Sequence, residues 1–304
     1  MRRAIVFTAG ICLGAGLLIL PARVTRSQTA SSYIGSEACK ECHQQQWDSF
    51  QASPHGHVDG ADQQGGGCES CHGPGSAHQD AGGDRTSPGF ATIRNFKTMK
   101  PAEIAAVCQN CHSAGAQFYW DKSRHAQRGV SCLNCHDIHG THGTPAHRAL
   151  LIQDDVNQVC LQCHKDKRSS LSRSAHMPLR EGSMTCADCH NPHGSSGPHM
   201  IKAASNNELC TSCHMDKRGP FLWEHPPVRE NCMNCHQPHG ANNAKVLASK
   251  EPYLCQRCHI ATRHPSTLYD YPDLASNRLL NRSCTNCHSM LHGSNHPSGK
   301  TFLR

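Results

Sequence analysis

The apolar positions of this chain fall into short stretches separated by polar segments. Helix-like stretches cover residues 101–111, which open with Pro101, and residues 154–163. Ser205 and Glu208 have the spacing of a capping box at the start of another helix. The alternation of apolar and polar positions that is typical of a strand is absent. The pattern therefore predicts short α-helices and long irregular loops, with essentially no β-sheet.

The composition indicates that side chains alone do not fill the interior. The chain has 304 residues, of which 5% are aromatic, and its mean hydropathy is −0.59. A chain of this length could form two domains, but it has too few large apolar side chains to pack two cores at normal density. It also contains 21 Cys and 25 His. Something other than side chains must occupy the inside.

Twenty of the 21 cysteines belong to ten Cys-x-x-Cys-His motifs. Two thiols at this spacing add across the two vinyl groups of one haem, and the adjacent His reaches its iron as the proximal ligand. Structural zinc sites and disulfides are the alternatives, but neither requires His after every second Cys. We therefore expect ten haem c groups. The attaching cysteines are Cys39, Cys42, Cys68, Cys71, Cys108, Cys111, Cys132, Cys135, Cys160, Cys163, Cys186, Cys189, Cys210, Cys213, Cys232, Cys235, Cys255, Cys258, Cys284 and Cys287. The proximal ligands are His43, His72, His112, His136, His164, His190, His214, His236, His259 and His288.

Ten further histidines recur at fixed places in five successive units. Each unit has a first motif, an inter-motif His, a second motif and a post-motif His. The first cysteines of successive units are 69, 52, 50 and 45 residues apart, a regularity typical of a tandem array. We expect these histidines to be distal iron ligands, which gives bis-His iron throughout. The inter-motif histidines are His55, His125, His176, His225 and His264, and the post-motif histidines are His78, His139, His193, His239 and His292.

The spacing limits which haem a distal His can serve. His139, His193 and His239 each lie three residues after a proximal His, too few to reach the opposite face of the same iron. They must serve another haem, so the haems are tied together in space. His57 remains an alternative to His55, and His296 to His292. For the histidines outside the pattern we expect solvent or propionate contacts; they are His57, His142, His147, His199 and His296.

Turn-forming residues surround the second motifs. Gly129 and Gly182 precede two of them, and the polar stretch 229–231 precedes a third. The sequences 191–194 and 237–240, both of the form x-Pro-His-Gly, read as further turns. We expect first motifs at the ends of helices and second motifs between turns. Both would wrap around a stack of haems that supplies most of the buried apolar area.

Two His ligands on every iron leave no position for a substrate. Multihaem enzymes need at least one five-coordinate iron, and the Cys-x-x-Cys-Lys motif of the nitrite reductases is absent from this sequence. We therefore expect an electron-transfer protein and not an enzyme. Its potentials should be low and graded, because haem exposure and nearby propionates differ from site to site.

Residues 1–30 have the features of an export signal. Arg2 and Arg3 precede an apolar run over residues 4–20, and none of the thirty is acidic. The run is shorter than an average membrane span, which favours a cleaved Sec-type signal peptide over an uncleaved anchor. Removing it leaves 26 basic and 23 acidic residues, a formal net charge of +3. Ten haems then make the protein acidic through their propionates, so nucleic-acid binding has no support.

Three stretches resemble the periplasmic decahaem cytochromes of the MtrA/DmsE group, which includes the PioA and MtoA iron-oxidation proteins. They are residues 185–194, residues 216–225 with 230–232, and residues 287–300, and the resemblance covers residues 33–304. It implies an elongated, linear stack of ten bis-His haems in two pentahaem halves, residues 31–170 and 171–304. It also implies a β-barrel porin of the outer membrane as a partner. A periplasmic or inner-membrane cytochrome and an outer-face multihaem cytochrome or reductase are the implied electron partners.

We therefore expect an electron conduit across the outer membrane, located in the periplasm and associated with that membrane through the porin. A closed barrel is needed because bare loops would leave backbone groups unsatisfied in lipid. A soluble periplasmic shuttle or electron store is the main alternative. A haem enzyme with a vacant iron and an extracellular filament are the others.

Overall fold

The computed structural model describes residues 31–58, 60, 63–139, 150–259 and 283–303. Twelve short α-helices lie in these ranges, the longest with nine residues. They are α1 Ser36–Lys40, α2 Gln44–Ala52, α3 Gly67–His72, α4 Ser76–Asp80, α5 Pro101–Gln109, α6 Arg124–Gln127, α7 Val156–Leu161, α8 Lys165–Leu171, α9 Cys186–Cys189, α10 Asn206–Thr211, α11 Pro226–Glu230 and α12 Tyr253–Gln256. The 3-10 helices are η1 Pro54–His57, η2 Phe90–Thr92, η3 Gly115–Gln117, η4 Trp120–Lys122, η5 Cys132–Asn134, η6 Pro198–Met200, η7 Met215–Lys217, η8 Cys232–Asn234, η9 Ala244–Val246, η10 Cys284–Asn286 and η11 Gly299–Thr301.

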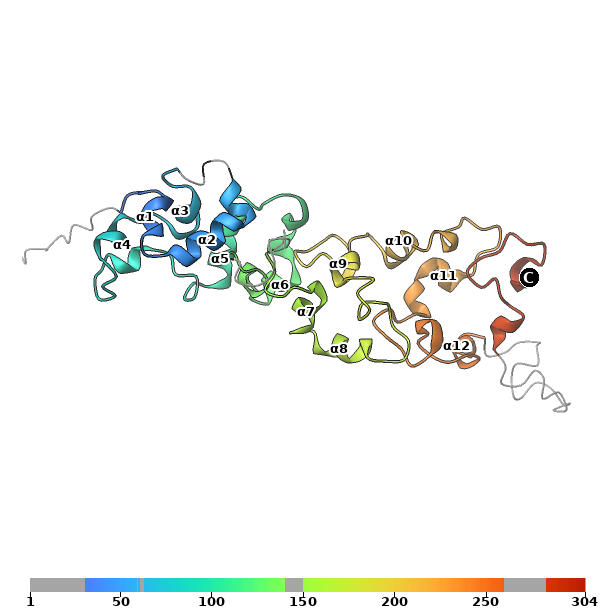
Figure 1. Ribbon diagram of the computed structural model, residues 1–304. Helices are drawn as coiled ribbons and strands as arrows, with labels where there is room; N and C mark the ends of the chain where they lie inside the picture. Colours follow the sequence, from blue (N-terminus) through green and yellow to red (C-terminus); the bar gives the residue numbers. More distant parts are fainter. Residues whose placement is uncertain (1–30, 59, 61–62, 140–149, 260–282, 304) are drawn as a thin grey trace, which may run out of the picture.

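The molecule is elongated and the chain advances steadily along it. Helices α1 to α4 lie at one end, and α11, α12 and the carboxyl terminus lie at the other (Figure 1). Pairing between extended segments is confined to isolated bridges in the described ranges, which contain no β-strand. The predicted class, short helices and irregular loops without a sheet, is therefore confirmed. The expected signal peptide and His264 lie outside the described residues, and none of the helices described here is long and apolar enough to span a membrane.

The predicted local elements can be compared with the helices. Residues 101–111 form α5, and residues 154–163 contain α7. Ser205 caps α10 by accepting a hydrogen bond from the Glu208 N–H, but the Glu208 carboxylate accepts from the Ala204 N–H and does not close the box. The turn predicted for residues 229–231 is wrong in part. Two prolines start α11 at Pro226, and this helix continues through Glu230 before the second motif begins.

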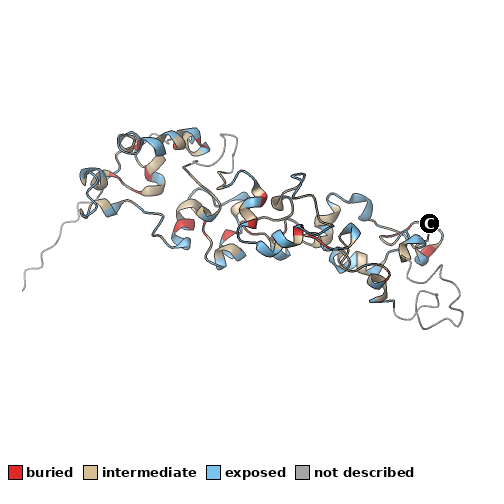
Figure 2. Ribbon diagram, turned by 60° about the horizontal axis from the view of Figure 1, so that its bottom comes forward, coloured by how far each residue is buried: buried red, intermediate tan, exposed pale blue. Residues whose placement is uncertain are grey.

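Buried apolar side chains are few and scattered along the molecule (Figure 2). In the described part of the chain they number eight: Phe50, Ile104, Ala105, Trp120, Leu161, Leu171, Ile201 and Ala241. Such a set cannot form one continuous core. The polypeptide therefore depends on something else for cohesion between its units.

An asparagine ties the two motifs together in the third unit and again in the fourth. Asn157 is 4% exposed, and its Oδ1 accepts a hydrogen bond of 2.7 Å from the Cys186 N–H. Its Nδ2 donates to the carbonyls of Leu179 and Met184. Asn207, three residues before the first Cys of its unit like Asn157, makes the equivalent 2.7 Å bond to the Cys232 N–H. Each asparagine thus holds a second motif against the helix of the first.

Replacing Asn157 by Ala should lower the free energy of unfolding of the holoprotein. Three hydrogen bonds are lost and their backbone partners are only partly exposed to water, so each unsatisfied group costs at most about 1–3 kcal/mol. Denaturant titration followed by far-ultraviolet circular dichroism measures the change. Gln158→Ala alters the exposed neighbour on the same helix and should leave the midpoint unchanged. Equal midpoints for the two variants would show that the asparagine does not couple the motifs.

The amino-terminal segment is anchored by a buried carboxylate. Glu69 is 3% exposed and accepts hydrogen bonds from the backbone N–H groups of Ile34, Gly35, Gly65 and Gly75. Burial raises the pKa of this carboxyl, but the four backbone donors outweigh burial and hold the pKa below its ordinary value. The ionised form therefore stabilises the fold.

Glu69→Gln should destabilise the holoprotein at neutral pH and matter less in acid. The unfolded chain has a Glu pKa of about 4.3, and the folded pKa is lower. The carboxylate's contribution is therefore complete above the unfolded value and is lost as the pH falls through the folded one. Urea midpoints measured between pH 7 and pH 3 should converge for the two proteins. A constant difference over this range would contradict the assignment.

Candidate haem array

The motif cysteines form a continuous series along the molecule. Within each unit the first cysteines of the two motifs lie next to each other, as in Cys39 with Cys68 and Cys108 with Cys132. The remaining pairs are Cys160 with Cys186, Cys210 with Cys232 and Cys255 with Cys284. Between units, the last cysteine of one second motif lies close to the next first motif: Cys71 to Cys108, Cys135 to Cys160, Cys189 to Cys210 and Cys235 to Cys255. The motifs therefore follow one another in space in their sequence order.

Eight of the expected distal histidines face a motif histidine. An iron held between two imidazoles separates the ring centroids by about 6.2 Å, since each metal–nitrogen bond is about 2.0 Å and each nitrogen is about 1.1 Å from its centroid. The observed centroid distances are 5.9 Å for His55–His112, 6.4 Å for His78–His43, 6.2 Å for His125–His164, 6.3 Å for His139–His72, 6.1 Å for His193–His136, 6.2 Å for His225–His259, 6.0 Å for His239–His190 and 6.2 Å for His292–His236. Each gap matches one iron atom.

The facing pairs connect neighbouring units. An inter-motif His faces the first motif of the following unit, and a post-motif His faces the second motif of the preceding unit. Thus His193 faces His136 and does not face His190, three residues before it. His78, which faces His43 of its own unit, is the exception at the amino-terminal end. Ligation through these pairs would fasten each unit to its neighbours.

A glycine after the post-motif His allows this close approach. Gly194, Gly240 and Gly293 have φ values of 106°, 142° and 136°, which side chains other than glycine rarely adopt. A Cβ on Gly240 would lie 1.9 Å from the carbonyl oxygen of Ser170 in the preceding unit. Any larger residue would therefore push the two units apart.

Backbone carbonyls set the ring orientation of several histidines. The Nδ1–H of His190 donates to the His199 carbonyl at 3.1 Å, and that of His236 donates to the Lys245 carbonyl at 3.0 Å. A proton on Nδ1 leaves the Nε2 lone pair for a metal. Further Nδ1–H donors are His72 to Arg94, His78 to Phe90 and His125 to Pro192. The acceptors His199 and Lys245 both lie nine residues after the proximal His and have positive φ, a repeat in spacing that could have been noticed in the sequence.

Burial also favours the neutral form of these rings, which is the form that binds a metal. It lowers the pKa of His55, His193, His239 and His292, which keeps the rings neutral at pH 7. The Nδ1 atoms of four facing rings, His55, His139, His193 and His225, are buried without a hydrogen-bond partner. These four rings therefore lack the backbone carbonyl contact at Nδ1 that orients His78 and His125.

A cavity of about 3820 Å³ runs along the array. Its lining extends from Tyr33 to Phe302 and includes residues of the second to tenth motifs. Pockets for a single small ligand usually measure about 300–1,000 Å³. The space, the paired cysteines and the iron-sized gaps together fit a series of haem c groups.

The alternative metal and disulfide interpretations find no support. The motif cysteines are free thiols, and the described ranges contain no group of three or more His, Cys, Asp or Glu residues that could hold a metal ion.

His292 faces a proximal ring, whereas the Nδ1 of His296 accepts a hydrogen bond from Ser298. His55 faces His112, while His57 is exposed and shows no ring contact within the described residues.

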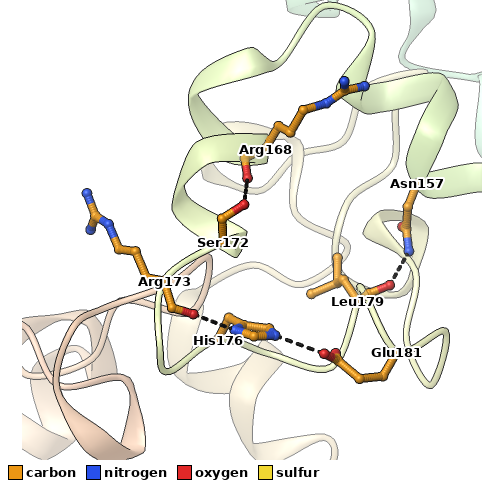
Figure 3. A network of polar contacts seen from close by, with 7 residues as sticks. All are labelled: Asn157, Arg168, Ser172, Arg173, His176, Leu179 and Glu181. Carbon is orange, nitrogen blue, oxygen red and sulfur yellow. Dashed lines mark hydrogen bonds and ion pairs between the residues drawn. The ribbon is translucent and has the colours of Figure 1, made fainter.

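His176 does not face a motif histidine within the described ranges. Its Nδ1–H donates to the Arg173 carbonyl at 2.8 Å, and its Nε2–H donates to Glu181 Oε1 at 3.0 Å (Figure 3). His214 is a proximal histidine for which the described ranges contain no facing ring. His264, His142 and His147 lie outside the described residues.

Comparison with known proteins finds a matching family model and several similar proteins. A family model described as a doubled CXXCH motif matches residues 125–169, 176–219 and 225–264. The multihaem cytochrome MtrA of Shewanella baltica (strain OS185) is 39% identical over 281 residues, which cover 89% of this chain and 81% of that protein. The dissimilatory sulfite reductase MccA of Wolinella succinogenes is 26% identical over 61% of this chain and 22% of its own length. The polyhaem cytochrome OmcB of Geobacter sulfurreducens is 24% identical over 60% of this chain and 25% of its own.

Proposed function

The chain belongs to the MtrA family of multihaem c-type cytochromes, and we propose that it is a ten-haem electron conduit across the outer membrane. Members of this family transfer electrons through covalently bound haem c and are not enzymes. The proposed conduit lies inside a β-barrel porin. It links periplasmic electron carriers with an extracellular cytochrome, a metal oxide or a terminal reductase.

The observation that carries the proposal is the ordered series of motifs with its facing histidines. Ten motifs follow one another from one end of an elongated molecule to the other (Figure 1). Eight of them have a second imidazole at the distance that a six-coordinate iron requires. His264 is proposed as a further distal ligand. An arrangement of this kind supports transfer over the full length of the chain.

The chain's own residues hold and orient the cofactors. Twenty cysteines would form the thioether links, and the histidine after each pair would bind the iron. Histidines from neighbouring units, with His78 from its own unit, would supply the second ligands, while backbone carbonyls at Nδ1 orient the rings of His190 and His236. When bound, haem c supplies a reversible one-electron iron couple, and a constant pair of ligands favours rapid exchange between neighbours.

The shape of the polypeptide supports a porin as partner. Its loops expose backbone N–H and C=O groups, which lipid cannot satisfy. A closed barrel satisfies its own backbone and can enclose such a chain across a hydrocarbon core about 30 Å thick. We propose export by the signal peptide over residues 1–30 and a periplasmic location at the outer membrane.

We propose two pentahaem halves, residues 31–170 and 171–304. The proposed boundary falls between two of the segments that match the family model, residues 125–169 and residues 176–219. The facing pair His136–His193 joins one half to the other. We therefore expect the halves to behave as one continuous array and not as separate folding units.

Extraction of native outer membranes with mild detergent tests the proposal. The haem-staining chain should migrate with a β-barrel protein in equal amounts, and an outer-face multihaem cytochrome is an expected third component. Recovery of the cytochrome alone from the periplasmic fraction would overturn the conduit and leave a soluble electron shuttle.

A further inference from the structure

The facing pair of His55 and His112 differs from the other pairs in ring orientation. Its two imidazole planes are 79° apart, which is close to perpendicular. The pair of His125 and His164 is at 56°, and every other facing pair has an interplanar angle between 12° and 29°. The perpendicular arrangement therefore marks one position in the array, that of the first motif of the second unit.

The angle between two imidazoles matters to an iron held between them. Axial ligands set the potential of haem iron, and each ring donates π electron density into the iron d orbital that extends perpendicular to the ring plane. Parallel rings raise one such orbital above the other, and the vacancy of ferric iron is stabilised in it. Perpendicular rings raise both orbitals about equally and stabilise the vacancy less. They therefore favour ferrous iron, and they give ferric iron a strongly anisotropic g tensor.

Hydrogen bonding at Nδ1 acts in the same direction. The Nδ1 of His55 is buried without a partner, and the described residues give the His112 ring no hydrogen bond. A hydrogen bond from Nδ1–H to a carbonyl makes an imidazole a stronger electron donor, which stabilises ferric iron. Other facing pairs have a backbone carbonyl at hydrogen-bonding distance from Nδ1 of one ring; these rings are His72, His78, His125, His190 and His236.

Buried apolar side chains lie in the segments that carry this pair. Phe50 is 7% exposed, lines the cavity and precedes His55 by five residues near the end of α2. Ile104 and Ala105, each 5% exposed, lie about one turn before Cys108 in α5. Apolar surroundings stabilise the charge of ferric iron less than water does. The environment therefore also favours ferrous iron.

The pair of His225 and His259 provides an internal comparison. The Nδ1 of His225 is also buried without a partner. Its ring is at only 21° to that of His259, however, and in the described ranges no buried apolar side chain follows Ala241. Among the facing pairs of the described chain, only His55 and His112 combine perpendicular rings with apolar surroundings and no hydrogen bond at Nδ1.

We propose that His55, His112 and the apolar side chains near them give the haem of this motif the highest reduction potential in the array. This haem is then the first to be reduced and the last to be oxidised. The inference deepens the proposed conduit and rests on the haem attachment proposed above. An electron would rest on this haem between transfer events, in the second of the five units.

A redox titration of the intact holoprotein, followed by electron paramagnetic resonance, tests this proposal. The oxidised protein should show one low-spin haem with a strongly anisotropic g tensor. Its signal should disappear before those of the other low-spin haems as the potential is lowered. His55→Ala should replace this signal by that of a high-spin iron. His57→Ala is the matched control two residues away and should leave the signal unchanged.

A second pair of variants keeps both ligands in place. Val107 and Val159 each precede the first Cys of a first motif, and both line the cavity. Val107→Thr replaces one methyl group by a hydroxyl. At a fixed potential it should lower the ferrous-to-ferric ratio of the anisotropic haem about threefold, which is about 28 mV at 59 mV per tenfold. Val159→Thr should leave this ratio unchanged. A shift of another haem's signal in Val107→Thr, or no shift, would contradict the assignment.

A haem count by the pyridine haemochrome method accompanies each titration. At ten haems, an anisotropic signal that disappears with or after the other low-spin signals would overturn the proposal and leave the proposed conduit standing. Survival of the signal in His55→Ala at a full haem count would also overturn it. Fewer than ten haems in the unaltered protein would instead contradict the proposed haem array itself.

Discussion

Replacing His193 by Met is expected to raise the reduction potential of one haem and to slow electron passage along the whole chain. His193 faces His136 at a centroid distance of 6.1 Å near the middle of the array. A thioether ligand in place of imidazole favours ferrous iron and raises the potential. Because the motifs follow one another in a single series, an electron cannot avoid this haem. It becomes a trap from which escape slows about tenfold for every 59 mV.

Spectroelectrochemical titration and stopped-flow oxidation measure the two effects. One-tenth of the haem absorbance should titrate at a higher potential than in the unaltered protein. A shift of about 100 mV would slow transit roughly 50-fold. His57→Met is the control, since His57 is exposed and faces no motif ring in the described part of the chain. An unshifted titration at full haem content would show that His193 is not a ligand.

Replacing His292 by Ala is expected to create a five-coordinate haem. His292 faces His236 at 6.2 Å and comes from the following unit, so its removal opens the distal face of the haem in the fourth unit. Electron paramagnetic resonance of the oxidised protein should show one more high-spin iron than in the unaltered protein. The reduced protein should bind one further equivalent of carbon monoxide.

His296→Ala tests whether His292 or the nearby His296 is the distal ligand. His296 lies four residues further on, and its Nδ1 is engaged by the Ser298 N–H. This variant should leave the spin state of every haem unchanged. A new high-spin signal in His296→Ala and none in His292→Ala would reverse the two roles.

The sequence alone predicts the chemistry of the array because covalent haem attachment leaves a local signature. The Cys-x-x-Cys-His spacing needs no knowledge of the fold, and the three-residue step from His190 to His193 already excludes a shared iron. The partner of His193 lies 57 residues earlier, at His136, and no local signal indicates that distance. Only the packing of one unit against the next brings the two rings together.

Backbone path accounts for what the sequence could not reveal. The carbonyls that orient His190 and His236 belong to residues with positive φ, His199 and Lys245, where side-chain identity gives little guidance. The same limit applies to His176. Its spacing matches that of the other inter-motif histidines, and a turn in place of a helix directs it to Glu181. Likewise, a turn was predicted before the second motif of the fourth unit, and the prolines at the start of α11 give a helix there.

The central claim is that electrons cross a membrane through this chain when a porin encloses it. Sealed vesicles with a trapped redox dye, reconstituted with the purified cytochrome and its co-purified barrel, test it most directly. An impermeant reductant added outside should reduce the trapped dye only when both proteins are present, and His193→Met should slow that reduction at equal haem content. Equal reduction with the barrel alone, or none with both proteins, would contradict the conduit.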